Sequence, residues 1–372
     1  MPVKTSLGES ERRAWLRLAR TPNVGPVTFK ALLERFGSAE FALANIPRLI
    51  GRGGGEPVRA PSIADVDREL EALMRAGGCM IASCEPEFPR GLAALDAPPP
   101  VIETLGHGSL LSRDAVAIVG ARNASALGRK FAERMARDLS DAGLLVVSGL
   151  ARGIDAAAHD GSLAGGTAAV LAGGVDVVYP PEHEALYKAI AAQGVVVSEV
   201  PFGTAPLARH FPRRNRIISG IARGVVIVEA AEGSGSLITA NYALEQGREI
   251  FAVPGSPLDP RAKGTNRLIR EGATLTESVD DVLAVLKPIL GNGFGDPEAG
   301  GSPQAPADAN ALEAEADRIR SRVEEALGPA PVEVDDLIRQ IGAPAAVILT
   351  VLLELELAGR LARDAGNRVG WI

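Results

Sequence analysis

The chain has 372 residues with 39 Lys or Arg and 46 Asp or Glu, so its net charge is −7 at neutral pH. This balance excludes a basic nucleic-acid coat, and only local charge can indicate a nucleic-acid site. With two cysteines and four histidines, a disulfide framework is excluded and a metal site is not expected. The sequence contains no run of 18 apolar residues, so no membrane-spanning helix is predicted.

Small helices are expected at the N-terminal end, over residues 11–18 and 27–36. They are joined by Thr-Pro-Asn-Val-Gly-Pro at 21–26, an outline similar to a helix-hairpin-helix that could contact a DNA phosphate. A structural hairpin is the favoured alternative, because Gly-Pro turns between helices are common. We expect a small SAM-like helical domain over residues 1–75. The first six residues lead into a charged stretch without the apolar segment of a signal peptide, which predicts a cytoplasmic protein.

Short apolar runs dominate the centre of the chain. They occupy residues 115–119, 144–147, 167–171, 195–198, 225–228 and 250–253, with a possible extra strand at 80–82 in an otherwise transitional segment, 76–114. Runs that are apolar on both faces are typical of a parallel sheet covered by helices. The sequence therefore predicts an α/β fold, with a Rossmann-like, mostly parallel sheet domain over residues 76–287.

The loops after these strands are rich in glycine and serine, as in Gly120-Ala-Arg-Asn, Ser148-Gly-Leu-Ala-Arg and Gly233-Ser-Gly-Ser. Ligands of open α/β sheets bind at the carboxyl ends of the strands, where small residues and helix N-termini favour phosphates. The first loop is not GxGxxG, the second strand lacks a terminal acid, and no GxxxxGK[ST] occurs. We therefore expect a phosphate site without NAD or ATP, and no cofactor.

Asp155 and His159 lie four residues apart at the start of a predicted helix. They could form an acid–base pair, but no nucleophile accompanies them. A structural role, in which Asp155 complements the helix dipole and orients His159 or a nearby arginine, is favoured.

The strongest local charge is a run of five arginines between Arg209 and Arg223 with no acid among them. This run could simply be the solvent-exposed beginning of a helix. However, Phe211 lies inside it, and an aromatic residue among arginines is typical of a site that stacks bases and holds phosphates. The adjacent apolar Ile217-Ile218 fixes its position against the core. With Arg122, Arg152 and Lys263 from other loops, the run predicts a groove for a sugar-phosphate backbone.

The predicted DNA-binding residues are Gly120, Arg122, Ser148, Arg152, Arg209, Phe211, Arg213, Arg214, Asn215, Arg216, Gly233, Ser234, Gly235, Ser236 and Lys263.

Residues 288–325 are predicted to be a flexible linker, because 288–311 are rich in Gly, Pro, Ala and acids and lack Lys and Arg. Residues 326–372 have the outline of a winged helix, with helices over 334–341 and 344–358. The second helix has Thr350, Glu354 and Glu356 on its polar face and no cation, so major-groove reading is not expected. Its apolar residues exceed one face, which indicates a contact with a partner or a second protomer.

Five segments together resemble the DNA-processing protein A family, also called DprA or Smf. They are Val116-Ala-Ile-Val-Gly-Ala-Arg, Val147-Ser-Gly-Leu-Ala-Arg-Gly-Ile-Asp, Phe211-Pro-Arg-Arg-Asn-Arg, Ser234-Gly-Ser-Leu-Ile-Thr-Ala and Val253-Pro-Gly. The resemblance implies a DNA site at Arg122, Phe211, Arg213, Arg214, Asn215 and Arg216. Some relatives have a basic residue three positions before the phenylalanine. Ala208 stands there in this chain, beside Arg209, so that contact is shifted or lost.

The same resemblance implies a non-enzymatic, homodimeric protein of natural transformation (competence) and recombination. Such a protein binds and protects incoming single-stranded DNA and helps to load the RecA recombinase. The alternative is a nucleoside-monophosphate phosphoribohydrolase of the lysine-decarboxylase-like fold, whose PGGxGTxxE motif supplies a catalytic glutamate. This chain has Gly233-Ser-Gly-Ser-Leu-Ile-Thr-Ala instead, and Glu245 comes too late. Single-strand binding is therefore the favoured function.

Overall fold

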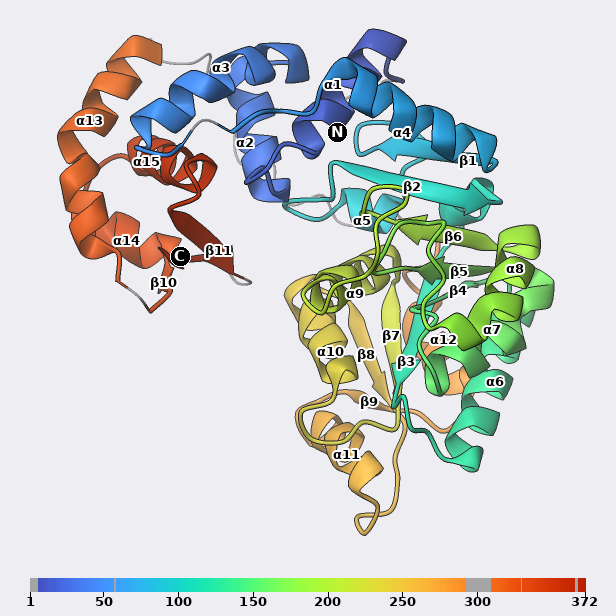
Figure 1. Ribbon diagram of the computed structural model, residues 1–372. Coiled ribbons are helices and arrows are strands. Elements are labelled where there is room, and N and C mark those ends of the chain that lie inside the picture. The colour runs from blue at the N-terminus through green and yellow to red at the C-terminus, as the bar shows by residue number, and fades with distance from the viewer. Residues whose placement is uncertain (1–5, 57, 292–308, 329, 365–366) are drawn as a thin grey trace. The chain divides into compact units, whose positions relative to one another are not determined.

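An open nine-stranded sheet forms the core of residues 68–291 in the computed structural model, which describes residues 6–56, 58–291, 309–328, 330–364 and 367–372 (Figure 1). We call residues 68–291 the sheet unit. Residues 7–67 and 309–372 pack together as a second unit, here called the terminal unit. The division between them falls inside α4 (Ile63–Arg75).

The strands run in the order β1-β2-β6-β5-β4-β3-β7-β8-β9. Their bounds are β1 Gly78–Ala82, β2 Val101–Gly106, β3 Ala115–Gly120, β4 Leu145–Ser148, β5 Thr167–Val170, β6 Val195–Ser198, β7 Gly224–Val228, β8 Glu249–Ala252 and β9 Thr274–Leu275. All pairs from β6 to β9 are parallel, whereas β1 and β2 pair antiparallel at one edge. The predicted Rossmann-like sheet is confirmed, while β2 and β9 were not expected.

Helices cover both faces of this sheet, as the two-sided apolar strands predict. Successive residues of β3 point to opposite faces of the sheet. Ala117 and Val119 pack with α9 and α10, whereas Val116 and Ile118 pack with α6 and α7. The helices are α5 Arg90–Ala93, α6 Ala126–Asp141, α7 Ile154–Ser162, α8 Glu184–Gln193, α9 His210–Ile221, α10 Gly235–Glu245, α11 Lys263–Arg270 and α12 Val279–Leu286, with short 3₁₀ segments at Gly108–Ser112, Leu163–Gly165, Pro181–His183 and Pro260–Ala262.

Chain order reverses at β3. From there β4, β5 and β6 follow on one side of the sheet, and β7, β8 and β9 lie on the other. The carboxyl ends of β3 and β7 therefore form the switch point at which open α/β sheets usually bind ligands. The loops predicted to hold DNA all leave from this edge.

The terminal unit combines the N-terminal helices with a winged helix, and both were predicted as separate domains. Its elements are α1 Glu9–Ala19, α2 Pro26–Phe36, α3 Ala39–Arg52, α13 Ala309–Ala326, β10 Val332–Glu333, α14 Val334–Ile341, α15 Ala345–Leu357, β11 Leu361–Asp364 and β12 Arg368–Trp371, with β10-β12-β11 as the sheet. The helical and winged-helix folds are confirmed, and their packing into one unit was not foreseen.

The linker predicted over residues 288–325 is contradicted in its second part, which is helix α13. Ala316, Ile319 and Val323 recur at helical spacing and are buried in the winged-helix core. An apolar stripe of this kind needs a partner surface, so these residues belong to the fold. Residues 292–308 lie outside the described residues.

Residues of helix α15 are buried in two different hydrophobic cores. Ile348, Val351 and Leu355 pack into the winged-helix core, whereas Leu353 and Leu357 complete the core of α1, α2 and α3. Glycine is required where α3 ends, because a Cβ at Gly53 would lie 2.2 Å from the Glu354 carbonyl oxygen. The excess apolar surface of α15 thus contacts helices of its own chain.

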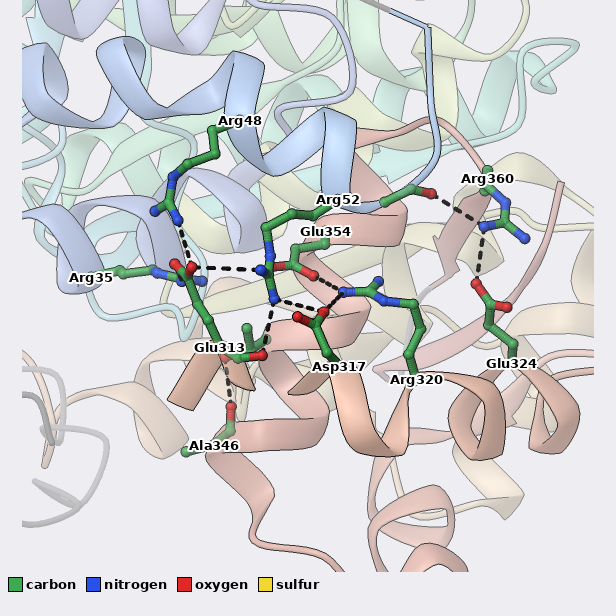
Figure 2. Close-up of polar contacts among 12 residues, drawn as sticks. Arg35, Arg48, Arg52, Glu313, Asp317, Arg320, Glu324, Ala346, Glu354 and Arg360 are labelled. Carbon is green, nitrogen blue, oxygen red and sulfur yellow. Dashed lines mark hydrogen bonds and ion pairs between the residues drawn. The ribbon is translucent and has the colours of Figure 1, made fainter. Parts of the chain in front are cut away.

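An arginine–carboxylate network joins the two ends of the chain (Figure 2). Arg35 and Arg48 contact the carboxylate of Glu313 at 2.7 and 2.5 Å. Arg52 binds the fully buried Glu354 at 2.7 Å, and Arg320 of α13 pairs with the other oxygen of that carboxylate. A charge removed from water needs such partners, so the network is a condition for burying α15.

None of the described helices is long and apolar enough to cross a membrane.

Candidate nucleic-acid interface

A cavity of about 340 Å³ opens at the carboxyl ends of β3, β4 and β5. It is lined by Arg122, Asn123, Gly149, Ala151, Arg152, Tyr179, Pro180, Phe211 and Arg214. Each lining segment follows a different strand, and α9 contributes Phe211 and Arg214 from the connection after β6. The cavity therefore gathers four of the predicted residues: Arg122 and Arg152 from two loops, and Phe211 and Arg214 from helix α9.

Phe211 contacts both a cation and a second aromatic ring. The guanidinium carbon of Arg122 is 5.4 Å from the Phe211 ring centroid, and the Tyr179 ring meets Phe211 edge-on at 5.5 Å and 61°. Tyr179 remains 48% exposed, and Arg122 is also exposed. These groups offer flat surfaces to a base and a charge to a phosphate, which is the chemistry of single-strand recognition.

Arg214 forms the floor of the cavity and is only 6% exposed. Its Nη1 donates to the carbonyl oxygens of Gly149 and Val170 at 2.5 and 2.6 Å, so this nitrogen is already engaged. A Cβ at residue 149 would lie 1.9 Å from Nη1, so only glycine fits there. Burial lowers the pKa of Arg214 to about 10, which leaves the side chain charged at neutral pH. The floor is thus a fixed positive charge.

Asp155 and His159 support this floor from below, which is the structural role favoured by the sequence. The Asp155 carboxylate accepts bonds from the backbone N–H groups of Gly149 and Ala151, and it partly neutralises Arg214. Burial raises the pKa of Asp155, and the charge of Arg214 opposes that shift. His159 shares a hydrogen bond with Thr167 at 2.8 Å, and burial lowers its pKa to about 3.

Several predicted residues have other partners. Ser148 is buried and donates to the Ile118 carbonyl at 2.6 Å, so its hydroxyl supports the sheet. Arg216 forms an ion pair with Glu199, and Arg152 forms one with Glu182 at the rim of the cavity. Asn215 donates to the carbonyl of Gly235 and so joins α9 to α10.

The remaining predicted residues lie along the same edge but do not line the cavity. Gly120 ends β3, where a Cβ would lie 1.8 Å from the Val228 carbonyl oxygen. Arg209 and Arg213 are exposed at the start of α9, and Lys263 is exposed as the first residue of α11. Gly233, Ser234, Gly235 and Ser236 lead into α10, with the Ser234 side chain capping that helix.

The sequence interpretation missed Asn123, Gly149, Ala151, Tyr179 and Pro180 as lining residues. Tyr179 could have been found, because it is an aromatic residue beside two prolines after the third predicted strand. The partners Glu182 and Glu199 lie outside the arginine run, and no local pattern marks them. Among the residues that the structure describes, no group of three His, Cys, Asp or Glu side chains comes together to hold a metal ion.

Comparison with known proteins matches three families of domain. A model described as DNA recombination-mediator protein A matches residues 79–287, and models described as a DprA-like N-terminal HHH domain and a DprA winged helix domain match residues 9–72 and 303–367. Protein Smf of Synechocystis is 32% identical across 97% of this chain and 99% of its own.

Two solved structures share the fold. DNA processing protein A from Streptococcus pneumoniae is 33% identical, with a TM-score of 0.63 over 75% of this chain and 98% of that chain. DNA processing protein A from Helicobacter pylori, whose structure is described as giving insight into a single-stranded DNA binding mode, is 26% identical, with a TM-score of 0.53 over 57% of this chain and 97% of that chain.

Proposed function

The chain belongs to the DNA recombination-mediator protein A family, and from that premise we propose that it binds single-stranded DNA at the cavity beside Phe211. The observation that carries the proposal is the group formed by Arg122 over the Phe211 ring and Tyr179 edge-on to it, beside the buried charge of Arg214. The Helicobacter pylori relative, described by its single-stranded DNA binding mode, supports it.

The chemistry of the cavity favours a strand whose bases are unpaired. A duplex keeps its bases stacked on one another, whereas a single strand can place a base against Phe211 and Tyr179 and a phosphate near Arg122. Stacking on an aromatic ring is tolerant of base identity, because every base has a π-face. The bound strand is therefore a single strand of any sequence.

The family membership extends the proposal to the biological role. We infer a homodimeric, cytoplasmic protein of natural transformation and recombination that protects incoming single strands and helps to load RecA. This part rests on the family resemblance, because the cavity itself recognises only the strand.

Hydrolysis of nucleoside monophosphates is the alternative, and it needs a carboxylate beside a bound ribose. The described residues that line the cavity include no acid, and Glu182 at its rim is paired with Arg152. Asp155 lies beneath the floor with its oxygen bonded to two backbone N–H groups. These positions favour strand binding over hydrolysis.

Fluorescence anisotropy with labelled oligo-dT, against a duplex of equal length, tests the proposal. Contacts with about three to five phosphates predict a log–log salt slope of roughly −2 to −3.5 for the single strand. Equal affinity for duplex and single strand would contradict it. Release of a base from nucleoside monophosphates, measured in parallel, would support the hydrolase instead.

A further inference from the structure

The switch point between β3 and β7 is closed by a side chain of the protein. In Rossmann-like sheets a ligand phosphate usually binds here, against the N-terminus of the helix that follows the first strand. That helix is α6, with Ser125 as its N-cap. The carboxylate of Glu229, the residue after β7, accepts a bond from the Ser125 N–H at 2.9 Å and one from the Ser125 hydroxyl at 2.5 Å.

Two backbone features accommodate this carboxylate. Glu229 has φ +53°, in the left-handed region that non-glycine residues rarely adopt. Gly128, in the first turn of α6, leaves room for the side chain, because a Cβ there would lie 2.6 Å from the Glu229 carboxyl carbon. Conformations of this kind persist where the surrounding structure imposes them, and they concentrate at functional sites.

The bonded Ser125 ends the short loop that carries Arg122. The loop runs from Gly120 at the end of β3 to Ser125, and Arg122 stacks on Phe211 from its middle. Its first part is held by the bond from the Ile154 N–H to the Ala121 carbonyl at 3.3 Å. Glu229 holds its last part, so the two anchors fix the loop on both sides of Arg122.

We propose that Glu229 is a positioning residue for single-strand binding: its bonds to Ser125 hold the Arg122 loop in the geometry that places the guanidinium over Phe211. This inference rests on the proposed function, since it assigns a role within that site. Glu229 is not among the residues that line the cavity. As a carboxylate near a polyanion it should otherwise weaken binding, so a loss of affinity on its removal distinguishes positioning from charge.

A double-mutant cycle tests the positioning role. Glu229→Ala is expected to weaken oligo-dT binding about three- to tenfold in the wild-type background and less than twofold in an Arg122→Ala background. Glu229→Gln, whose amide oxygen can still accept the Ser125 hydroxyl, should recover part of the affinity. Glu232→Ala is the matched control, because it removes an exposed acid from the same β7–α10 loop. Its affinity should stay equal to wild type or rise slightly.

A spin label at residue 122 gives a readout that needs no DNA. With Cys79 and Cys84 replaced by serine and Arg122→Cys labelled, Glu229→Ala should increase the mobility of the nitroxide, and Glu232→Ala should not. Unchanged mobility would overturn the positioning role, as would equal losses of affinity in both backgrounds or tighter binding by both Glu229 variants. If Glu229→Ala increased the mobility of the label while Arg122→Ala left DNA affinity unchanged, Glu229 would still position the loop, but the proposed DNA site at Arg122 would be wrong.

Discussion

Replacement of Glu354 by glutamine should destabilise the terminal unit as a whole. The Glu354 carboxylate is fully buried and binds Arg52 of α3 and Arg320 of α13. Removing one member of a buried ion pair costs about 3–5 kcal/mol, because the remaining charge stays buried without its counter-charge. Glutamine keeps one acceptor oxygen, and Asp317 still contacts both arginines. We therefore expect a loss of about 3 kcal/mol in the free energy of unfolding.

The two tryptophans make this loss measurable without interference from the sheet unit. Trp15 and Trp371 are the only tryptophans of the chain, and both belong to the terminal unit. Trp15 packs against Phe29 with ring centroids 5.1 Å apart, and Trp371 donates to the Leu327 carbonyl at 2.9 Å. Tryptophan emission during denaturation therefore follows this unit, and Trp15→Phe or Trp371→Phe variants follow each end alone.

The matched control is Asp336→Asn, which breaks an exposed ion pair with Arg339 in α14. Exposed pairs contribute about 0–1 kcal/mol, so this change should have little effect. Glu354→Gln should shift the emission of both tryptophans together, since residues 7–67 and 309–372 form one unit. A shift no larger than that of Asp336→Asn, or separate transitions for Trp15 and Trp371, would refute the reasoning.

Four further outcomes are expected. Phe211→Ala should weaken oligo-dT binding by about 1–3 kcal/mol in anisotropy titrations, and Phe211→Tyr should retain most of the affinity because the ring remains. Arg122→Ala should weaken binding and flatten the log–log salt slope by about 0.7; an unchanged slope would argue against a phosphate contact. The folded pKa of His159, about 3, lies below its ordinary value, so its contribution is complete above about pH 6.5 and declines as the pH falls toward 3. The free energy of unfolding should fall by about 3 kcal/mol by pH 4.5, and denaturant titrations should show this fall absent from His159→Gln. A chain ending at residue 287 should keep most of its single-strand affinity, because the cavity lies in the sheet unit; a tenfold loss, about 1.4 kcal/mol, with that unit still folded would contradict this.

The sheet and part of its binding edge could be predicted because their signals are local. Runs such as 195–198 and 225–228 are apolar on both faces, which only a doubly covered strand explains. Glycine-rich loops after such strands meet at one edge whatever the details of packing. Arg122, Arg152 and Phe211 were therefore placed together correctly from the sequence.

The partners of the arginines could not be predicted, because they come from distant segments. Arg216 and Arg223 belong to a run without acids, yet each pairs with an acid outside it, Glu199 and Asp114. Arg214 was predicted to belong to the DNA site, but no pattern in the sequence indicated that its Nη1 donates to the backbone carbonyls of Gly149 and Val170. Whether a cation is free depends on tertiary contacts, which a run of like charges does not reveal.

The predicted linker failed for a different reason. Its first half lacks Lys and Arg and is rich in glycine and proline. The predicted linker was continued beyond that composition, into residues that include the apolar stripe Ala316, Ile319 and Val323. The sequence showed that α15 has more apolar residues than one face needs, but the pattern of these residues does not show which surface they contact. The partner is the N-terminal helical core of the same chain.

The joining of both chain ends in one unit has a consequence for synthesis. Residues 7–67 leave the ribosome about 290 residues before Leu357, which completes their core. At about 5–20 residues per second, that interval lasts roughly 15–60 s. During this time the apolar residues that later contact α15 remain exposed. Arg35, Arg48 and Arg52 also lack their ion-pair partners Glu313 and Glu354. The N-terminal helices of the nascent chain should therefore need a chaperone more than the central sheet, which forms from neighbouring segments.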